Sequence, residues 1–294
     1  MTGVAALLAP GFFSSGPVHT ALALGTVVAI VCGAVGVFTV IRSQAFAGEA
    51  LSDIGAAGGS ASFLVGVAPL WGFLAAGIAA AAVMEMIGVQ RARGRELATG
   101  IVLGASLGLA ALFLYLDSTL SAGAGSTVTI LFGSLFALNA SLIPAVGALS
   151  LLATGAVCTL QRPLLLSSLN PDLASVRGIP VRLLGVIYLI TLAVAVALAA
   201  LTIGAILGTA LLVGPAATAL RLTRRPGLAM LTAAGLGVVS VWIGILLSYD
   251  SFLWPPRGQG WPVSFFVVGV VFVFYLGLGL LGPRRSGRRE QGGG

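Results

Sequence analysis

The sequence contains no lysine and a single histidine, and charged residues make up only 8% of its 294 residues. It has two cysteines, Cys32 and Cys158, and both lie within apolar runs, so neither a structural disulfide nor a thiolate metal site is indicated. The histidine, His19, precedes the first apolar run, and no GxxxxGK[ST] phosphate loop is present. These absences exclude the usual nucleophile and base constellations, so any nucleotide that is used must bind another chain.

The composition is typical of an integral membrane protein. Hydrophobic residues make up 58% of the chain, the mean hydropathy is +1.11, and no polar block is long enough for a soluble domain. We therefore predict one transmembrane domain over residues 1–294. The net charge of +7 comes from arginines in short loops, where they act as orientation signals, so nucleic acid is not indicated as a partner.

The apolar runs are bounded by Arg, Pro or Gly and predict an all-α, polytopic helical bundle of about nine spans within residues 21–283. The seventh run is short, which predicts a tight turn before it, and Pro215 within that run predicts a helix kink. The predicted spans are Ala21–Ile41, Gln44–Val67, Pro69–Gly88, Ala98–Leu116, Leu138–Leu160, Leu183–Thr202, Ala205–Leu220, Gly227–Ser248 and Val263–Gly282.

The distribution of arginines predicts the orientation of the bundle. If the N-terminus lies outside, every arginine except Arg257 falls on the inner side, as short cytoplasmic loops require. This pattern favours nine spans, a cytoplasmic loop over residues 161–182 and a cytoplasmic tail over residues 284–294.

Two carboxylates fall where the bilayer is expected. The apolar stretch Ile54–Val67 covers only about 21 Å, whereas a hydrocarbon core is about 30 Å thick, so the span must begin near Gln44. Glu49 and Asp53 then lie inside the membrane and, at positions i and i+4, share one helix face. Because an ionised residue at mid-bilayer costs on the order of 2.5 to 3.5 kcal/mol, we interpret the pair as a site visited by a cation.

Two structural interpretations of the pair remain open. Glu49 and Asp53 fit an inner-surface loop, or a protonated, hydrogen-bonded pair that locks helices together. The glycines that follow them, Gly55, Gly58 and Gly59, favour close helix packing.

The loop over residues 161–182 contains the signals of a short helix. Asn170 is typical of a helix N-cap, and Pro171 is typical of the first helical position. Asp172 favours the amino end of the helix, and Gly178 is typical of the residue that follows its carboxyl end. A helix of about seven residues is too short to be stable alone, so either the bundle or a soluble partner must hold it.

Four stretches in sequence resemble the membrane permease subunit of bacterial ABC importers for zinc, manganese and iron, which are type II importers. Together they cover most of the chain from the first predicted span to the eighth. They are GEALSDIGAAGG (Gly48–Gly59), ILFGSLFAL (Ile130–Leu138), LNPDLASVRGIPVRLL (Leu169–Leu184) and GAILGTALLVGPAATALRLTRR (Gly204–Arg225).

The resemblance implies a homodimeric or pseudo-dimeric permease in the bacterial cytoplasmic membrane. Its expected partners are cytoplasmic ABC ATPase subunits, an external metal-binding protein, a second permease copy and the lipid bilayer. The metal ion is cargo, no permanently bound cofactor is implied, and ATP hydrolysis belongs to the partner chain. Glu49 and Asp53 align with the family's intramembrane metal ligands, and the ATPase-coupling helix aligns with Asn170, Pro171, Asp172, Leu173, Ala174, Arg177 and Gly178.

The sequence departs from the family pattern at the metal site. Asp53 stands in place of the family histidine, Glu49 in place of an aspartate and Ala57 in place of a proline. Two oxygen ligands without imidazole suit Mn²⁺ or Fe²⁺ better than Zn²⁺ by ligand hardness. The alternative function from the residues alone is an ATP-independent secondary transporter or channel with Glu49 and Asp53 as an ion or proton relay. A membrane scaffold without transport is a third possibility.

Overall fold

The computed structural model describes residues 15–86, 92–120, 124–133, 135–136, 138, 140–223, 225–254 and 260–281. Within these ranges every regular element is a helix, which confirms the predicted all-α class. The helices are α1 (Gly16–Ile41), α2 (Ala45–Leu64), α3 (Pro69–Met86), α4 (Ala92–Leu120), α5 (Ala124–Phe132), η2 (Ala140–Leu142), α6 (Ile143–Leu169), α7 (Pro171–Val176), α8 (Val181–Ile203), α9 (Ala205–Leu222), α10 (Pro226–Asp250), η3 (Ser251–Leu253) and α11 (Val263–Leu281).

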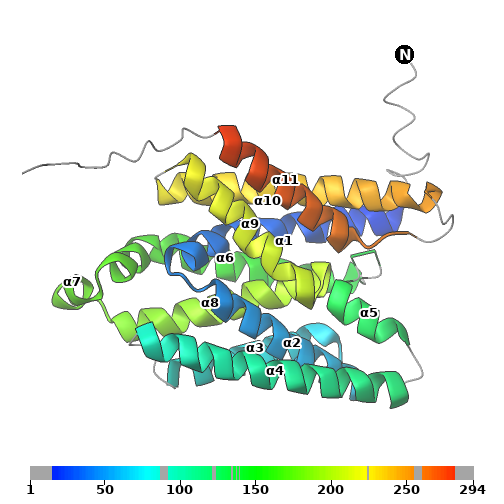
Figure 1. Ribbon diagram of the computed structural model, residues 1–294, viewed down its shortest axis with the longest axis horizontal. Coiled ribbons are helices and arrows are strands. Elements are labelled where there is room, and N and C mark those ends of the chain that lie inside the picture. The colour runs from blue at the N-terminus through cyan, green and yellow to red at the C-terminus, as the bar shows by residue number, and fades with distance from the viewer. Residues whose placement is uncertain are drawn as a thin grey trace, which may run out of the picture.

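The bundle is organised around α1 and α8, whose residues are mostly buried. Helix α1 packs against α10, α9 and α6, whereas α8 packs against α3 and α9. Helices α2, α3 and α4 form the opposite side of the bundle from α10 and α11 (Figure 1). Helix α7 lies at one end of the bundle and α5 towards the other (Figure 1).

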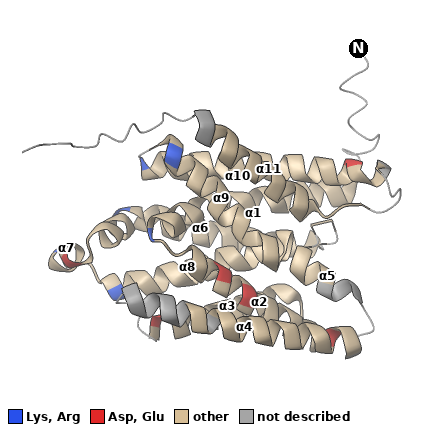
Figure 2. Cartoon of the chain, in the orientation of Figure 1, with Lys and Arg blue, Asp and Glu red and all other residues tan. Residues whose placement is uncertain are grey.

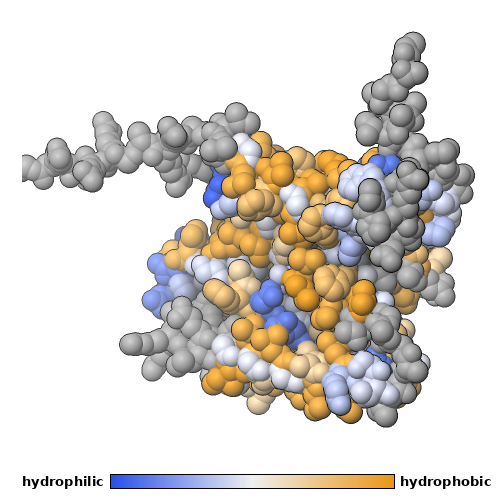
Figure 3. All heavy atoms as spheres, turned by 45° about the vertical axis from the view of Figure 1, so that its right-hand side comes forward, coloured by the Kyte–Doolittle hydropathy of each residue, from blue (hydrophilic) through white to orange (hydrophobic). Residues whose placement is uncertain are grey.

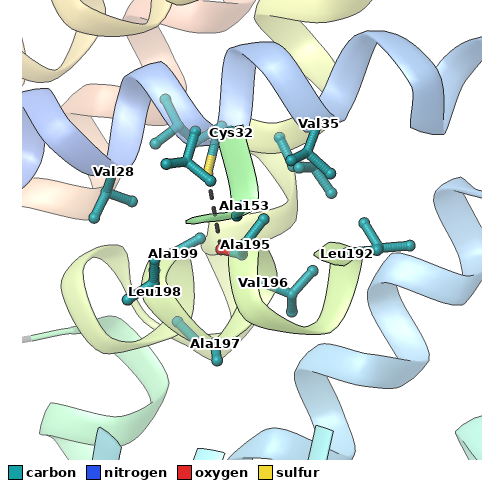
Figure 4. Packing of buried hydrophobic residues seen from close by; sticks show 14 of the residues in the cluster. Val28, Cys32, Val35, Ala153, Leu192, Ala195, Val196, Ala197, Leu198 and Ala199 are labelled. Atoms are coloured by element: carbon teal, nitrogen blue, oxygen red, sulfur yellow. Dashed lines mark hydrogen bonds between the residues drawn. The ribbon is translucent and has the colours of Figure 1, made fainter. Parts of the chain in front are cut away.

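Small side chains bring the two central helices together. Cys32 of α1 points at α8, where its thiol donates to the carbonyl oxygen of Ala195 at 4.0 Å (Figure 4). The surrounding side chains are alanine, valine and leucine, including Val28, Val196 and Leu198 (Figure 4). Close packing of this kind holds helices together in a bilayer, where lipid is as apolar as the side chains.

A helix stands at each of the nine positions predicted as a span. Of the described helices, six are long and apolar enough to cross a membrane: α1, α3, α6 with η2, α8, α9 and α10. Helix α2 is not among them, because its acids, serines and glycines lower its mean hydropathy. The predicted tight turn before the seventh run is confirmed, since only Gly204 separates α8 from α9.

The structure differs from the prediction at one boundary and in one additional helix. Helix α6 continues through Pro163 to Leu169, so the first part of the loop predicted over residues 161–182 is helical. Proline is tolerated inside such helices because neighbouring groups satisfy the freed backbone carbonyl. Helix α5 was not predicted, since nine residues are too few to form a span. Among the positions used for orientation, Arg91, Arg224, Arg257 and the tail 284–294 lie outside the described residues.

Candidate functional site

Helix α2 is delimited by two tight backbone turns. At its start Ser43 adopts a left-handed φ of 54°, and the amide of Gln44 donates to the Thr39 carbonyl at 2.9 Å. At its end Gly66 has a φ of 74°, and the Val67 amide donates to the Ser62 carbonyl at 2.8 Å. Six-to-one bonds around a left-handed residue are typical helix stops. The first therefore ends α1 directly before α2, and the second ends α2.

Glu49 and Asp53 lie on one face of α2, as their spacing predicted. Both side chains are half-buried, while Ala50, Leu51 and Ser52 between them are buried. Figure 2 shows two adjacent acidic segments on α2, midway along the bundle. The space-filling view shows a hydrophilic patch enclosed by hydrophobic surface on one face of the molecule (Figure 3).

Helix α2 is held against α9 by a buried hydrogen bond. The hydroxyl of Ser52 donates to the Ala205 carbonyl at 2.7 Å. Ser52 immediately precedes Asp53 in the chain, and Ala205 is the first residue of α9. This bond therefore fixes the rotation of α2 beside its acidic face.

The glycines after the acids bring α2 close to α3. A Cβ at Gly58 would stand 2.5 Å from the Cβ of Ala76, and one at Gly59 would stand 2.6 Å from the ring of Phe73. Only glycine fits at this distance. The two helices thus form a closely packed pair behind the carboxylates.

One protomer supplies an incomplete set of metal ligands. Across the described ranges, no group of three or more His, Cys, Asp or Glu side chains is placed to hold a metal ion. The donors at Glu49 and Asp53 are carboxylate oxygens, which suit hard divalent cations. A cation at this face needs further ligands from water or from another chain.

The short helix α7 has the cap that its sequence predicted. The Asn170 side chain accepts a hydrogen bond from the Leu173 amide at 2.9 Å, Pro171 occupies the first turn, and Asp172 lies beside the amino end. Gly178 follows the helix with a φ of 75°. The signals for the start and the stop of α7 are confirmed.

Helix α7 is anchored by one residue and exposes the others. Ala174 is buried, whereas Leu173 is 44% exposed and Val176 is 84% exposed. Arg177, at the carboxyl end, is also exposed. Apolar and charged side chains thus face outward at one end of the bundle.

Pro215 and Glu85 lie on α9 and α3. Helix α9 continues through Pro215, which is buried. Glu85, near the end of α3, packs against α8 at Gly185, where an added Cβ would stand 3.4 Å from the carboxylate.

Sequence reasoning missed a buried polar cluster at the start of α2. Arg42 donates to the hydroxyls of Ser167 and Ser168 on α6 at 3.3 and 3.2 Å. Its guanidinium also lies 5.0 Å from the ring centroid of Tyr188 on α8, and the Tyr188 hydroxyl lies 2.8 Å from that of Thr39. The only sequence signal was an arginine at a span boundary, which we interpreted as an orientation signal.

The fold and the acidic pair together define a helical membrane protein with a polar face within its bundle. Residues 17–257 match the ABC 3 transport family. The chain belongs to this family and is therefore a multi-pass permease subunit of the cytoplasmic membrane, a transport component and not an enzyme.

Two known proteins similar to this chain are named for metal transport. It is 29% identical to the manganese transport system membrane protein MntC of Halalkalibacterium halodurans, over 78% of each chain. It is 27% identical to the high-affinity zinc uptake system membrane protein ZnuB of Haemophilus influenzae, over 80% of this chain and 90% of that protein. The solved structure of PsaBC from Streptococcus pneumoniae in complex with Fab has the same fold, with a TM-score of 0.81, 23% identity and coverage of 96% and 97% of the two chains.

Proposed function

We propose that this chain forms the membrane pathway of an importer for a divalent transition-metal ion. The observation that carries the proposal is the pair Glu49 and Asp53 on one half-buried face of α2, in a chain of the ABC 3 transport family. The relatives named for manganese and zinc transport support a metal as cargo. Among manganese, iron and zinc, the oxygen-only donor pair favours manganese or iron.

Two copies of the chain complete the site in this proposal. One protomer offers two carboxylates, fewer than the four to six ligands that such ions take. A dimer with the α2 faces opposed supplies four carboxylates, and water fills the remaining positions. Such a site binds weakly enough to release its ion, as transport requires.

The proposed arrangement has nine spans, an external N-terminus and a cytoplasmic C-terminus. A cytoplasmic ATPase then docks on α7, whose exposed Leu173, Val176 and Arg177 form the contact. An external metal-binding protein delivers the ion at the opposite end. ATP-driven movement of the ATPase opens the path between the two copies alternately outward and inward, and the buried Pro215 supplies a kink in α9.

The test is metal accumulation in a strain deficient in metal import. The strain expresses this chain with its ATPase and binding protein, and Mn, Zn and Fe are measured in cells. We expect the cellular content of one metal to rise when the native chain is expressed. We expect this accumulation to be at least about tenfold lower in Glu49→Gln/Asp53→Asn, because the ligands lose their charge. Asp250→Asn, at the end of α10, is the matched control and retains uptake.

Two results would contradict the proposal. Unchanged uptake in the double variant would remove the acidic pair from the pathway. Uptake that survives depletion of ATP but collapses with the proton gradient would show an ATP-independent carrier.

A further inference from the structure

A cavity separates α7 from the start of α2. It has a volume of about 320 Å³. It is lined by Arg42 and Gln44 beside the start of α2, Glu85 of α3, Ser167 of α6, Pro171, Asp172 and Ser175 of α7, and Val181, Arg182 and Gly185 of α8. Movement of α7 therefore reaches α2 around the cavity, through the helices on which α7 packs. Those helices are α6 and α8.

Arg42 contacts both of these helices with one side chain. Its guanidinium donates to Ser167 and Ser168, which lie in the last turn of α6. The same group lies over the ring of Tyr188 on α8. Asn170 both ends α6 and caps α7, so the two serines stand two and three residues before the α7 cap.

The connection from Arg42 to the acidic pair is short and rigid. Arg42 ends α1, Ser43 takes the left-handed conformation, and Gln44 begins α2 through a backbone bond to Thr39. Glu49 follows within the second turn of α2. A displacement of the Arg42 backbone is therefore passed to α2 across the short turn at Ser43 and Gln44.

We propose that Arg42 is a positioning residue that transmits movement of α7, through α6 and α8, to the acidic face of α2. The inference rests on the proposed function, in which the ATPase docks on α7 and the ion binds at the acidic face of α2. A guanidinium suits this role because its planar fork reaches two hydroxyls while its face stacks on an aromatic ring. A lysine ammonium is a compact charge and offers only part of these contacts.

The first test uses the full complex with ATPase and binding protein in proteoliposomes, with Mn²⁺ as the ion. Metal transported per ATP hydrolysed is compared between native protein and Arg42→Gln. We expect the ratio to fall at least fivefold while ATPase association changes less than twofold. Arg42→Lys restores part of the ratio, which a purely structural role does not predict.

Two further variants keep the result interpretable. Ser167→Ala/Ser168→Ala leaves Arg42 in place but removes its hydrogen-bond acceptors on α6, so we expect less metal transported per ATP hydrolysed. This variant keeps the inference testable if Arg42→Gln does not insert into the membrane. Arg221→Gln is the control, because Arg221 also lies over a tyrosine, Tyr275, but joins α9 to α11. We expect Arg221→Gln to transport as much metal per ATP hydrolysed as the native protein.

The second test measures movement directly. Spin labels are placed at Val176 on α7 and at Phe46 on α2, which are 84% and 77% exposed, in a Cys158→Ser background. The distance between the labels stays constant between ATP-free and ATP-bound states in otherwise native protein. In Arg42→Gln it changes, because α7 moves without α2.

The outcomes separate the inference from the proposed function. Absence of ATP-dependent uptake by the native complex overturns both. Native uptake with an unchanged transport ratio in Arg42→Gln and in the serine double variant overturns the inference alone. A parallel loss of uptake and ATPase association in both variants shows a structural role for Arg42 and also overturns it.

Discussion

The hydroxyl of Ser52 donates to the carbonyl of Ala205 at 2.7 Å, and so joins α2 to the first residue of α9. Ser52 immediately precedes Asp53 on α2, and Ala205 immediately follows the turn at Gly204. It is buried at both ends, since Ser52 and Ala205 are each about 1% exposed.

Ser52→Ala is expected to destabilise the bundle by about 0.6 to 1.7 kcal/mol, the range of interhelical hydrogen bonds in membranes. The measurement is the free energy of unfolding in mixed detergent micelles. Ser60→Ala is the control, because Ser60 donates within its own helix to the Ala56 carbonyl and joins no other element. Equal effects of the two substitutions would contradict a role for the Ser52 bond between helices.

Gly58→Ala is expected to force α2 away from α3. The new Cβ would stand 2.5 Å from the Cβ of Ala76 and 3.0 Å from the Gly72 carbonyl carbon, so the packed backbones must separate. Overpacking of this kind costs typically about 1 to 3 kcal/mol, measured as a lower thermal transition of the purified protein. Gly104→Ala, at an open site on α4, leaves the transition unchanged or raises it.

Gly204→Ala is expected to prevent correct packing of the turn between α8 and α9. Gly204 has a φ of 102° and a ψ of 156°, a region open essentially to glycine alone, and a Cβ would also meet the backbone of Phe132 at 2.6 Å. We expect loss of monodisperse protein in size-exclusion chromatography. At Gly66, where φ is 74° but no atom lies within 4 Å, alanine costs only the backbone strain of about 1 to 2 kcal/mol.

Asn170→Ala is expected to weaken binding of the ATPase to α7. Loss of a helix cap costs about 0.5 to 2 kcal/mol, which corresponds to a two- to thirtyfold higher Kd if the helix must order on binding. The measurement is ATPase binding to the permease in nanodiscs. Ser175→Ala removes only a side-chain bond within α7 and is the control. An unchanged Kd in Asn170→Ala would show that α7 is not part of the ATPase contact.

Much of the fold follows from local sequence. Apolar runs bounded by Arg, Pro or Gly locate the long helices, because burial in lipid is decided by composition over about 20 residues. The cap at Asn170 and the stop at Gly178 locate α7, since these signals act within one turn. The i and i+4 spacing puts Glu49 and Asp53 on one face of whichever helix contains them.

The tertiary structure decided which side chains meet. Arg42 and Ser167 are 125 positions apart, and no local pattern relates them. Helix α5 and the last turns of α6 also depend on neighbours, because one is too short to span and the other passes through Pro163. The sequence by itself determined the long helices, the short helix α7 and the acidic face of α2, because the signals for them are local in the chain. Their contacts were decided by long-range packing, which brings the end of α1, the last turn of α6 and α8 together around one arginine.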